Sequence, residues 1–121
     1  MQVIKTGQVP KERRNDPLFT GGVVTAQSLT SVQVAGRANI NLVNFAKGAK
    51  NKFHSHSADQ VLIVTSGKGI VASEKQEVVV GVGDIIFIPS GEKHWHGATK
   101  DSEFSHMYVM SAENKTTQLE D

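Results

Sequence analysis

Short runs rich in valine and isoleucine, separated by turns that contain glycine, are the feature that most limits what this chain can fold into. Branched aliphatic side chains favour strands because they pack well on a pleated surface. Many short strands separated by such turns are typical of an all-β sandwich or barrel. The continuous apolar runs 61–64 and 85–88 are expected of strands with both faces covered. We predict strands at 22–27, 38–46, 60–65, 69–73, 77–80, 84–88 and 103–111, with little or no helix.

The length and composition indicate one globular domain spanning 1–121. The chain has 121 residues, of which 38% are hydrophobic and 21% charged, the balance of an ordinary folded protein. Residues 1–20, which contain Pro10 and Pro17, are expected to form an irregular arm. Residues 112–121 are expected to form a polar tail that frays or packs on a neighbour.

Charge and cysteine content exclude several classes of function. The 13 basic and 12 acidic side chains are scattered and give a net charge of +1, so we expect no nucleic-acid partner. The absence of cysteine excludes disulfides, thiolate metal sites and a cysteine nucleophile. No apolar run reaches membrane-spanning length, and the N-terminus lacks the apolar core of a signal peptide. We therefore expect a cytoplasmic protein that does not contact a membrane.

The five histidines all lie between positions 54 and 106 and include two His-x-His pairs. His54 and His56 form the first pair, His94 and His96 form the second, and His106 stands alone. Residues i and i+2 of a strand point to the same face, so each pair can direct two imidazoles at one point. A single pair arises by chance, but two pairs beside glycine turns favour a metal site over isolated core histidines.

These residues fall into two spaced motifs that resemble the signature motifs of the cupin superfamily. The first motif has a glycine, five residues, His-x-His, a glutamate after three or four residues, and a glycine after six more. The second has a glycine, five residues, Pro-x-Gly, two residues, a histidine and often a later asparagine. The first is matched by Gly48, His54, His56, Gln60 and Gly67, and the second by Gly83, Pro89, Gly91 and His94, with Ala98 at the asparagine position.

The resemblance implies a jelly-roll barrel, also called a double-stranded β-helix, with a metal inside one mouth. It implies that His54, His56 and His94 are metal ligands, with Gln60 in the place of the glutamate. It also implies a homodimer, since dimers are usual among cupins. The segment 91–99 together with His106 is similar to the small cupins associated with carboxymuconolactone decarboxylases, which include the bacterial manganese-dependent hydroxynitrile lyases. Those proteins also have glutamine at the position of Gln60.

The expected ligands suggest which metal and which chemistry the site suits. Three neutral imidazoles and one carboxamide leave the full +2 charge of a divalent ion uncompensated, which makes a stronger Lewis acid of the metal and disfavours its oxidised state. Imidazole and oxygen ligands suit several divalent transition metals. We expect one such ion, with Mn or Fe favoured and Ni, Co and Zn also compatible.

Two histidines and two strand faces complete the expected site. His96 and His106 are the candidates for acid–base catalysis, because imidazole titrates near neutral pH; the alternative for His96 is a group that only orients a ligand. The expected pocket-lining residues alternate along two strands, and we prefer a purely core role for Phe45 and Met110. The complete pocket set is Asn41, Val43, Phe45, Tyr108 and Met110.

Three functions remain open from the sequence. The first is a metal-dependent lyase, isomerase or decarboxylase-like enzyme that acts on a small oxygenated metabolite, with His96 or His106 transferring a proton. The second is an oxygenase that uses Fe, Ni or Mn. The third is a metal-dependent module that binds or senses a small molecule without turnover. The Tyr108 and Asn41 side chains would narrow or polarise the pocket relative to hydroxynitrile lyases, which argues against cyanohydrin chemistry.

Overall fold

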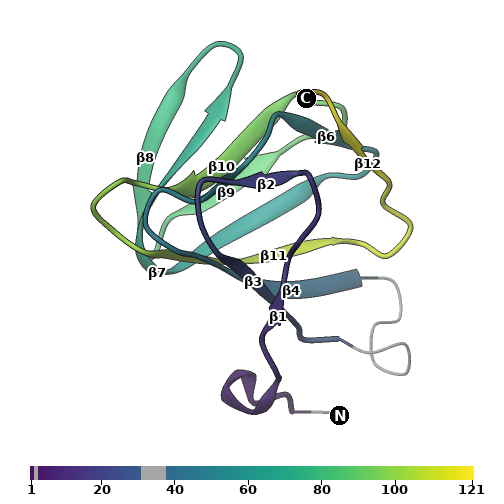
Figure 1. The fold of residues 1–121 in the computed structure, drawn as a ribbon. Coiled ribbons are helices and arrows are strands. Elements are labelled where there is room, and N and C mark those ends of the chain that lie inside the picture. Colours follow the sequence, from purple (N-terminus) through teal and green to yellow (C-terminus); the bar gives the residue numbers. More distant parts are fainter. Residues whose placement is uncertain (2, 31–37) are drawn as a thin grey trace.

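The computed structural model, which describes residues 1, 3–30 and 38–121, is built almost entirely from strands (Figure 1). Its one short helix is a 3₁₀ turn at Thr6–Gln8. The all-β prediction is therefore confirmed. The strands are β1 Glu12–Arg13, β2 Phe19–Thr20, β3 Val24–Ser28, β4 Ala38–Phe45, β5 Lys50–Asn51, β6 His54–His56, β7 Gln60–Ser73, β8 Glu77–Gly81, β9 Ile85–Ile88, β10 His94–Ala98, β11 Phe104–Ser111 and β12 Thr116–Gln118.

The strands form two antiparallel layers that share β7 and curl into a jelly-roll barrel. The first layer has the order β1-β3-β4-β11-β7-β9, and the second joins β8, β7 and β10 to β5 and β6, with β2 and β12 outside them. In Figure 1 the β3, β4 and β11 layer lies below, and β2, β6, β10 and β12 lie above it. The site histidines come from the upper layer and from β11.

The space between the layers is filled by inward-facing apolar side chains. Alternate residues of β4 point inward, and Phe45 there stacks on Phe104 of β11 with ring centroids 5.8 Å apart. Both rings are buried, as is Val64 of β7. This aromatic and aliphatic cluster occupies one end of the barrel and leaves the other end to polar side chains.

The predicted break between the strands 60–65 and 69–73 is wrong, because β7 runs without interruption through residues 66–68. Ser66 and Gly67 pair with Ser105 and Phe104 of β11, and the register shifts between Ser105 and His106. Gly67 has a positive φ of 71°, and a Cβ there would collide with the Glu103 carbonyl oxygen. The register shift leaves Thr65 without a register partner on β11, which is a bulge two residues before Gly67, and β7 continues from the first layer to the second instead of reversing.

Both chain ends contain short strands that were not among the predicted ones. The 1–20 segment contains β1, which pairs with β3, and β2, which pairs with β5. The polar tail contains β12, which pairs with β6. These strands have only two or three residues and little apolar character, so their pairing depends on the neighbouring strand and leaves no periodicity in their own sequences.

The expected coverage of both faces fails for β9. Ile86 and Ile88 face the interior, but Ile85 is 68% exposed and Phe87 is 61% exposed. The strand lies at the edge of its layer and pairs with β7. Its outward side chains are apolar, although nothing in the described part of the chain covers them.

No helix in the described ranges is long and apolar enough to cross a membrane.

Candidate metal centre

Two neighbouring strands bring the three expected histidine ligands together. His54 and His56 lie two residues apart on β6, and His94 at the start of β10 pairs directly with His54. The imidazole ring centroids of His54 and His94 are 4.3 Å apart, and those of His54 and His56 are 4.8 Å apart. One ring nitrogen from each of the three lies within 4.8 Å of the others. Three imidazoles thus converge on one point inside the barrel.

Backbone carbonyls fix two of these imidazoles in the form that a metal requires. The Nδ1 atom of His54 lies 2.7 Å from the Lys52 carbonyl oxygen, and Nδ1 of His94 lies 2.8 Å from that of Glu92. Since a carbonyl oxygen only accepts hydrogen bonds, each Nδ1 donates, and the Nε2 lone pair is left free. Such hydrogen bonds orient metal-binding histidines in known sites.

Unpartnered polar atoms mark the centre of this cluster. Nε2 of His56, Nε2 of His94 and Oε1 of Gln60 are buried and have no hydrogen-bond partner in the described structure. Buried polar atoms are almost always paired, because an unpaired one costs about 1–3 kcal/mol. A divalent cation would pair all three, so the residues present fit a metal held by three imidazoles and one carboxamide oxygen.

The electrostatics of the cluster favour neutral imidazoles. Burial, reinforced by the neighbouring histidines, lowers the pKa of His54 to about 3 and that of His56 to about 4. Burial also lowers the pKa of His94. All three are therefore unprotonated at neutral pH, the state that binds metal ions.

His96 and His106 form a second, deeper pair. Nε2 of His106 lies 2.9 Å from Nδ1 of His96, and the His94 and His96 rings stack with centroids 5.6 Å apart. Burial is the main cause that lowers the pKa of His106 to about 3 and that of His96 well below its usual value. Both imidazoles are therefore neutral, and the hydrogen bond between His106 Nε2 and His96 Nδ1 contains a single proton.

Asn51 holds His96 in place, and nothing in the sequence pointed to it. Its Oδ1 accepts a hydrogen bond from the His96 backbone N–H at 2.8 Å, and its Nδ2 lies 3.3 and 3.4 Å from the two ring nitrogens. Thr116 of β12 was missed in the same way, and its Oγ1 lies 2.9 Å from Nδ1 of His56. Both contacts join residues at least 45 positions apart in sequence, so no local motif could show them.

A cavity of about 210 Å³ opens beside the histidines. His54, His56, Gln60 and His96 line its inner end, whereas the fully buried His106 lies behind His96. Three of the five expected pocket residues line it, namely Val43, Tyr108 and Met110. Asn41 is buried opposite Tyr108 in the β4–β11 ladder, and Phe45 belongs to the apolar core. The N-terminal arm closes the mouth with four residues that the sequence did not suggest: Arg14, Asp16, Leu18 and Phe19.

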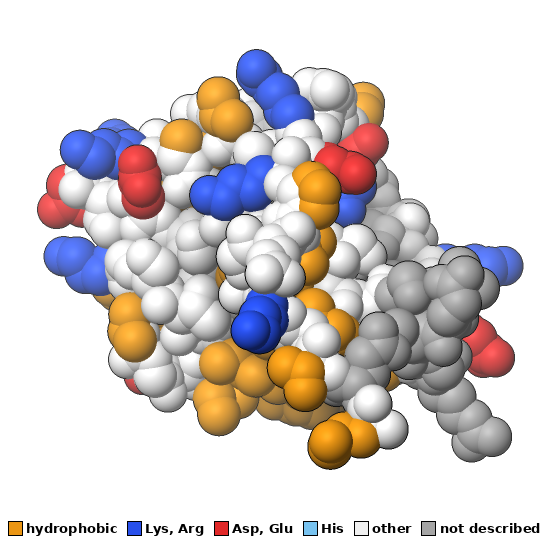
Figure 2. All heavy atoms as spheres, turned by 90° about the horizontal axis from the view of Figure 1, so that it is seen from below, with side chains coloured by type: hydrophobic (Ala, Val, Ile, Leu, Met, Phe, Trp, Pro, Cys, Tyr) orange, Lys and Arg blue, Asp and Glu red, His pale blue; other side chains and the backbone are white. Residues whose placement is uncertain are grey.

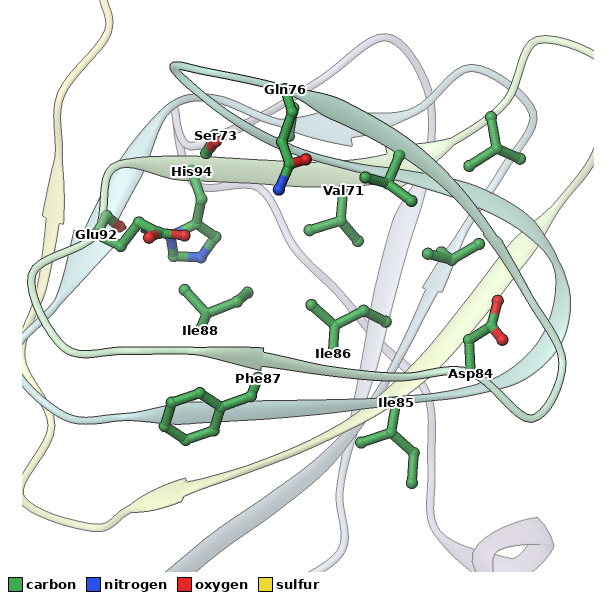
Figure 3. Close-up of a pocket in the computed structure, with 14 residues that line it drawn as sticks. Val71, Ser73, Gln76, Asp84, Ile85, Ile86, Phe87, Ile88, Glu92 and His94 are labelled. Carbon is green, nitrogen blue, oxygen red and sulfur yellow. Dashed lines mark hydrogen bonds between the residues drawn. The ribbon is translucent and has the colours of Figure 1, made fainter.

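His94 lies at one end of a second cavity. Figure 3 shows the second cavity between β8 and β9, with Val71, Ile86 and Ile88 pointing into it and His94 at one end. It has a volume of about 470 Å³ and is mainly apolar. His94, one of the three expected ligands, therefore also contacts this second cavity.

The fold and site define a small β-barrel with a buried centre of three histidines and one glutamine suited to a divalent metal. Residues 41–110 match the cupin domain family, and this match covers more than half of the chain. The chain therefore belongs to the cupin superfamily.

One curated relative and two solved structures extend this assignment. The chain is 36% identical to (R)-mandelonitrile lyase from Granulicella tundricola over 97 residues. These residues are 79% of this chain and span 66% of that relative's length. A cupin-like protein from Thermotoga maritima superposes with a TM-score of 0.82 at 27% sequence identity. The matched region covers 100% of this chain and 90% of the Thermotoga chain. The polyketide cyclase RemF from Streptomyces resistomycificus superposes with a TM-score of 0.87 at 19% sequence identity. The matched region covers 98% of this chain and 85% of the RemF chain.

Proposed function

We propose that this protein is a metal-dependent lyase that acts on a small hydroxyl- or carbonyl-bearing substrate. The observation that carries the proposal is the convergence of three neutral imidazoles and one carboxamide oxygen, with buried unpaired atoms, at the inner end of a cavity of about 210 Å³. His54, His56, Gln60 and His94 would hold one divalent transition metal, Mn or Fe by preference. The 36% identity to a mandelonitrile lyase favours lyase chemistry over the alternatives.

When bound, the metal supplies Lewis acidity, which lowers the pKa of a coordinated hydroxyl group. Four neutral ligands leave its charge uncompensated, which suits this role better than the activation of oxygen. The protein supplies the rest of the chemistry through the residues that surround the cavity.

His96 is the proposed proton acceptor. Its ring lines the cavity, is neutral at physiological pH, and is held by Asn51 and by His106. In the direction of cleavage, His96 takes the substrate hydroxyl proton and the hydroxyl oxygen becomes a carbonyl oxygen as the adjacent carbon bond breaks. The leaving group departs with the electron pair and receives the proton from His96. His106 does not line the cavity, so its role is to position His96.

The outer part of the cavity indicates what the substrate carries at its other end. Burial raises the pKa of Tyr108, although the charge of Arg14 and a hydrogen bond with Asn41 oppose the shift. The phenol is therefore protonated and can donate a hydrogen bond. Arg14 lies at the mouth, and the described structure places no carboxylate within 4.0 Å of its guanidinium. A small substrate with a carboxylate or another oxygen-rich group would meet both side chains.

Turnover and binding by the metal-loaded protein test this proposal. The assay follows carbonyl formation from mandelonitrile and from a panel of 2-hydroxy acids, with metal content measured in parallel. His96→Gln should retain the metal and lose about 100-fold or more in kcat. Binding of every candidate without any turnover would contradict the lyase assignment and favour a binding module.

A matched pair of arginine variants tests the substrate class separately. Arg14→Gln should weaken the binding of mandelate to the metal-loaded protein by about tenfold, because it removes one charge-assisted hydrogen bond. Arg13→Gln is the control, since Arg13 pairs with Thr25 on β3 and does not line the cavity. Equal affinity in both variants would refute the role of Arg14 while leaving the metal centre intact.

A further inference from the structure

Apolar side chains that reach the surface gather in two regions of the described structure. One region is the outer side of the first layer, where Figure 2 shows hydrophobic side chains grouped on part of the surface. The other is the second cavity, which has a volume of about 470 Å³ and lies between β8 and β9 (Figure 3). This volume falls within the roughly 300–1,000 Å³ of typical small-molecule sites. The second cavity, unlike the outer side of a sheet, can enclose a small molecule between two strands.

The second cavity forms because β7 belongs to both layers. β9 pairs with its first part, residues 60–63, whereas β8 pairs with its second part, residues 68–72. β8 and β9 therefore lie at the edges of different layers, and they do not pair with each other in the described structure. The space between these edges has an apolar floor, onto which Val71, Ile86 and Ile88 point (Figure 3).

The second cavity is distinct from the cavity of about 210 Å³ that is proposed to take the substrate. The two cavities share no lining residue. His94 contacts the second cavity, but its Nε2 atom is buried. A molecule in the second cavity would therefore touch the imidazole of His94 without reaching the atom that is left free for a metal.

The charged side chains around the second cavity are both acidic. Glu92 and Asp84 lie at opposite ends of it (Figure 3), and neither lysine nor arginine is among the described residues that line it. The Asp84 carboxylate accepts a hydrogen bond from the Gly81 backbone N–H at 2.8 Å. Glu92 has no ion-pair partner within 4.0 Å in the described part of the chain, because the neighbouring Lys93 pairs with Glu74 at 3.6 Å. The cavity thus combines an apolar floor with one uncompensated negative charge.

We propose that the second cavity binds a small primary amine with an aromatic or branched aliphatic carbon skeleton. The skeleton lies on the apolar floor, and the ammonium group pairs with the Glu92 carboxylate. The side-chain amide of Gln76 points into the cavity (Figure 3) and offers its oxygen as a further hydrogen-bond acceptor. The two carboxylates would repel an anion of the same size, and a neutral molecule would leave the charge of Glu92 uncompensated.

Isothermal titration calorimetry of the purified full-length protein with 2-phenylethylamine tests the proposal. One equivalent of the amine should bind with a Kd on the order of 1 mM or below. Its affinity should exceed that of the neutral 2-phenylethanol by about threefold, the contribution of an exposed ion pair. Glu92→Gln should abolish this preference. Glu77→Gln is the matched control, because it removes the same charge from β8 but Glu77 does not line the cavity.

A second pair of variants tests the location of the bound amine. Val78 lines the cavity and is 46% exposed, so the larger ring in Val78→Phe should occupy the cavity and weaken amine binding about tenfold or more. Val82→Phe is the control, since Val82 is 68% exposed and lies outside the cavity. An amine held by the metal centre instead would bind Glu92→Gln and Val78→Phe as tightly as the wild type, which would overturn the proposal. Absence of amine binding to the wild type up to about 20 mM, or equal affinity for the amine and the alcohol, would also overturn it.

Discussion

Mild acid should unfold the metal-free protein, because its buried histidines are neutral in the folded state. Burial lowers the pKa of His54 and His106 to about 3 and that of His56 to about 4, from 6.5. Since these folded-state pKa values lie below those of the unfolded chain, the unfolded chain binds protons first as the pH falls. The free energy of unfolding therefore has its full value, as far as these histidines determine it, above about pH 6.5. It decreases progressively from there toward pH 3–4.

The size of this effect follows from the pKa differences. Each histidine that stays neutral in the fold costs about 1.4 kcal/mol for every pH unit below 6.5. At pH 5 the loss is about 2 kcal/mol for each, or about 6 kcal/mol for the three together. This is comparable with the roughly 5–15 kcal/mol that stabilises a typical domain.

Urea unfolding in the presence of EDTA measures the effect, with the fluorescence of Trp95 as the signal. Trp95 is the single tryptophan of the chain and is 9% exposed. At one protein concentration, the free energy of unfolding should be nearly constant from pH 8 to 7 and fall steeply between pH 6 and 5. His106→Gln should reduce that slope by about 1.4 kcal/mol per pH unit. Equal stability at pH 7.5 and pH 5.5 would refute the reasoning.

Two further substitutions test the fold and the ligand geometry. Gly67→Ala should lower the free energy of unfolding by about 1–3 kcal/mol, because the positive φ of Gly67 and the nearby Glu103 carbonyl exclude a side chain. Gly7→Ala is the control in the same urea assay and should have little effect, because a Cβ at Gly7 has no atom within 4 Å. Thr116→Val should weaken metal affinity about tenfold in a competition titration by removing the contact with His56, whereas equal weakening in Thr117→Val would show that β12 matters only as a strand.

The fold class was predictable because strand-forming side chains and turn residues are local signals. The run of apolar residues at β4, the first half of β7 and β11 each marked a strand whose bounds differ little in the structure. Two-residue strands such as β1 and β5 were not predicted, because their residues gain strand geometry only from the neighbour that they pair with. The continuity of β7 through Gly67 was missed for a related reason: a glycine can lie in a turn or in a continuing strand, and the pairing with β11 decides which.

The convergence of the expected ligands could be anticipated because β6 and the start of β10 each carry a His-x-His pair. The i, i+2 rule placed His54 and His56 on one face, and the motif spacing suggested His94 as the third. The partners of these residues could not be found in this way. Asn51 and Thr116 reach the site through pairings between distant strands, and Arg14 reaches the mouth because the N-terminal arm crosses it.

Metal content of the purified, untagged protein tests the central claim most directly. Inductively coupled plasma mass spectrometry should find about one equivalent of a divalent transition metal per chain in the wild type and in Ser55→Ala. Ser55 lies between the two histidines in sequence, but its side chain points to the opposite face of β6 and is not among the converging donors. His54→Ala/His56→Ala, shown to be folded by circular dichroism, should contain none. A wild type that binds no metal after reconstitution with Mn, Fe, Co, Ni or Zn, or a double variant that binds as much as the wild type, would contradict the account.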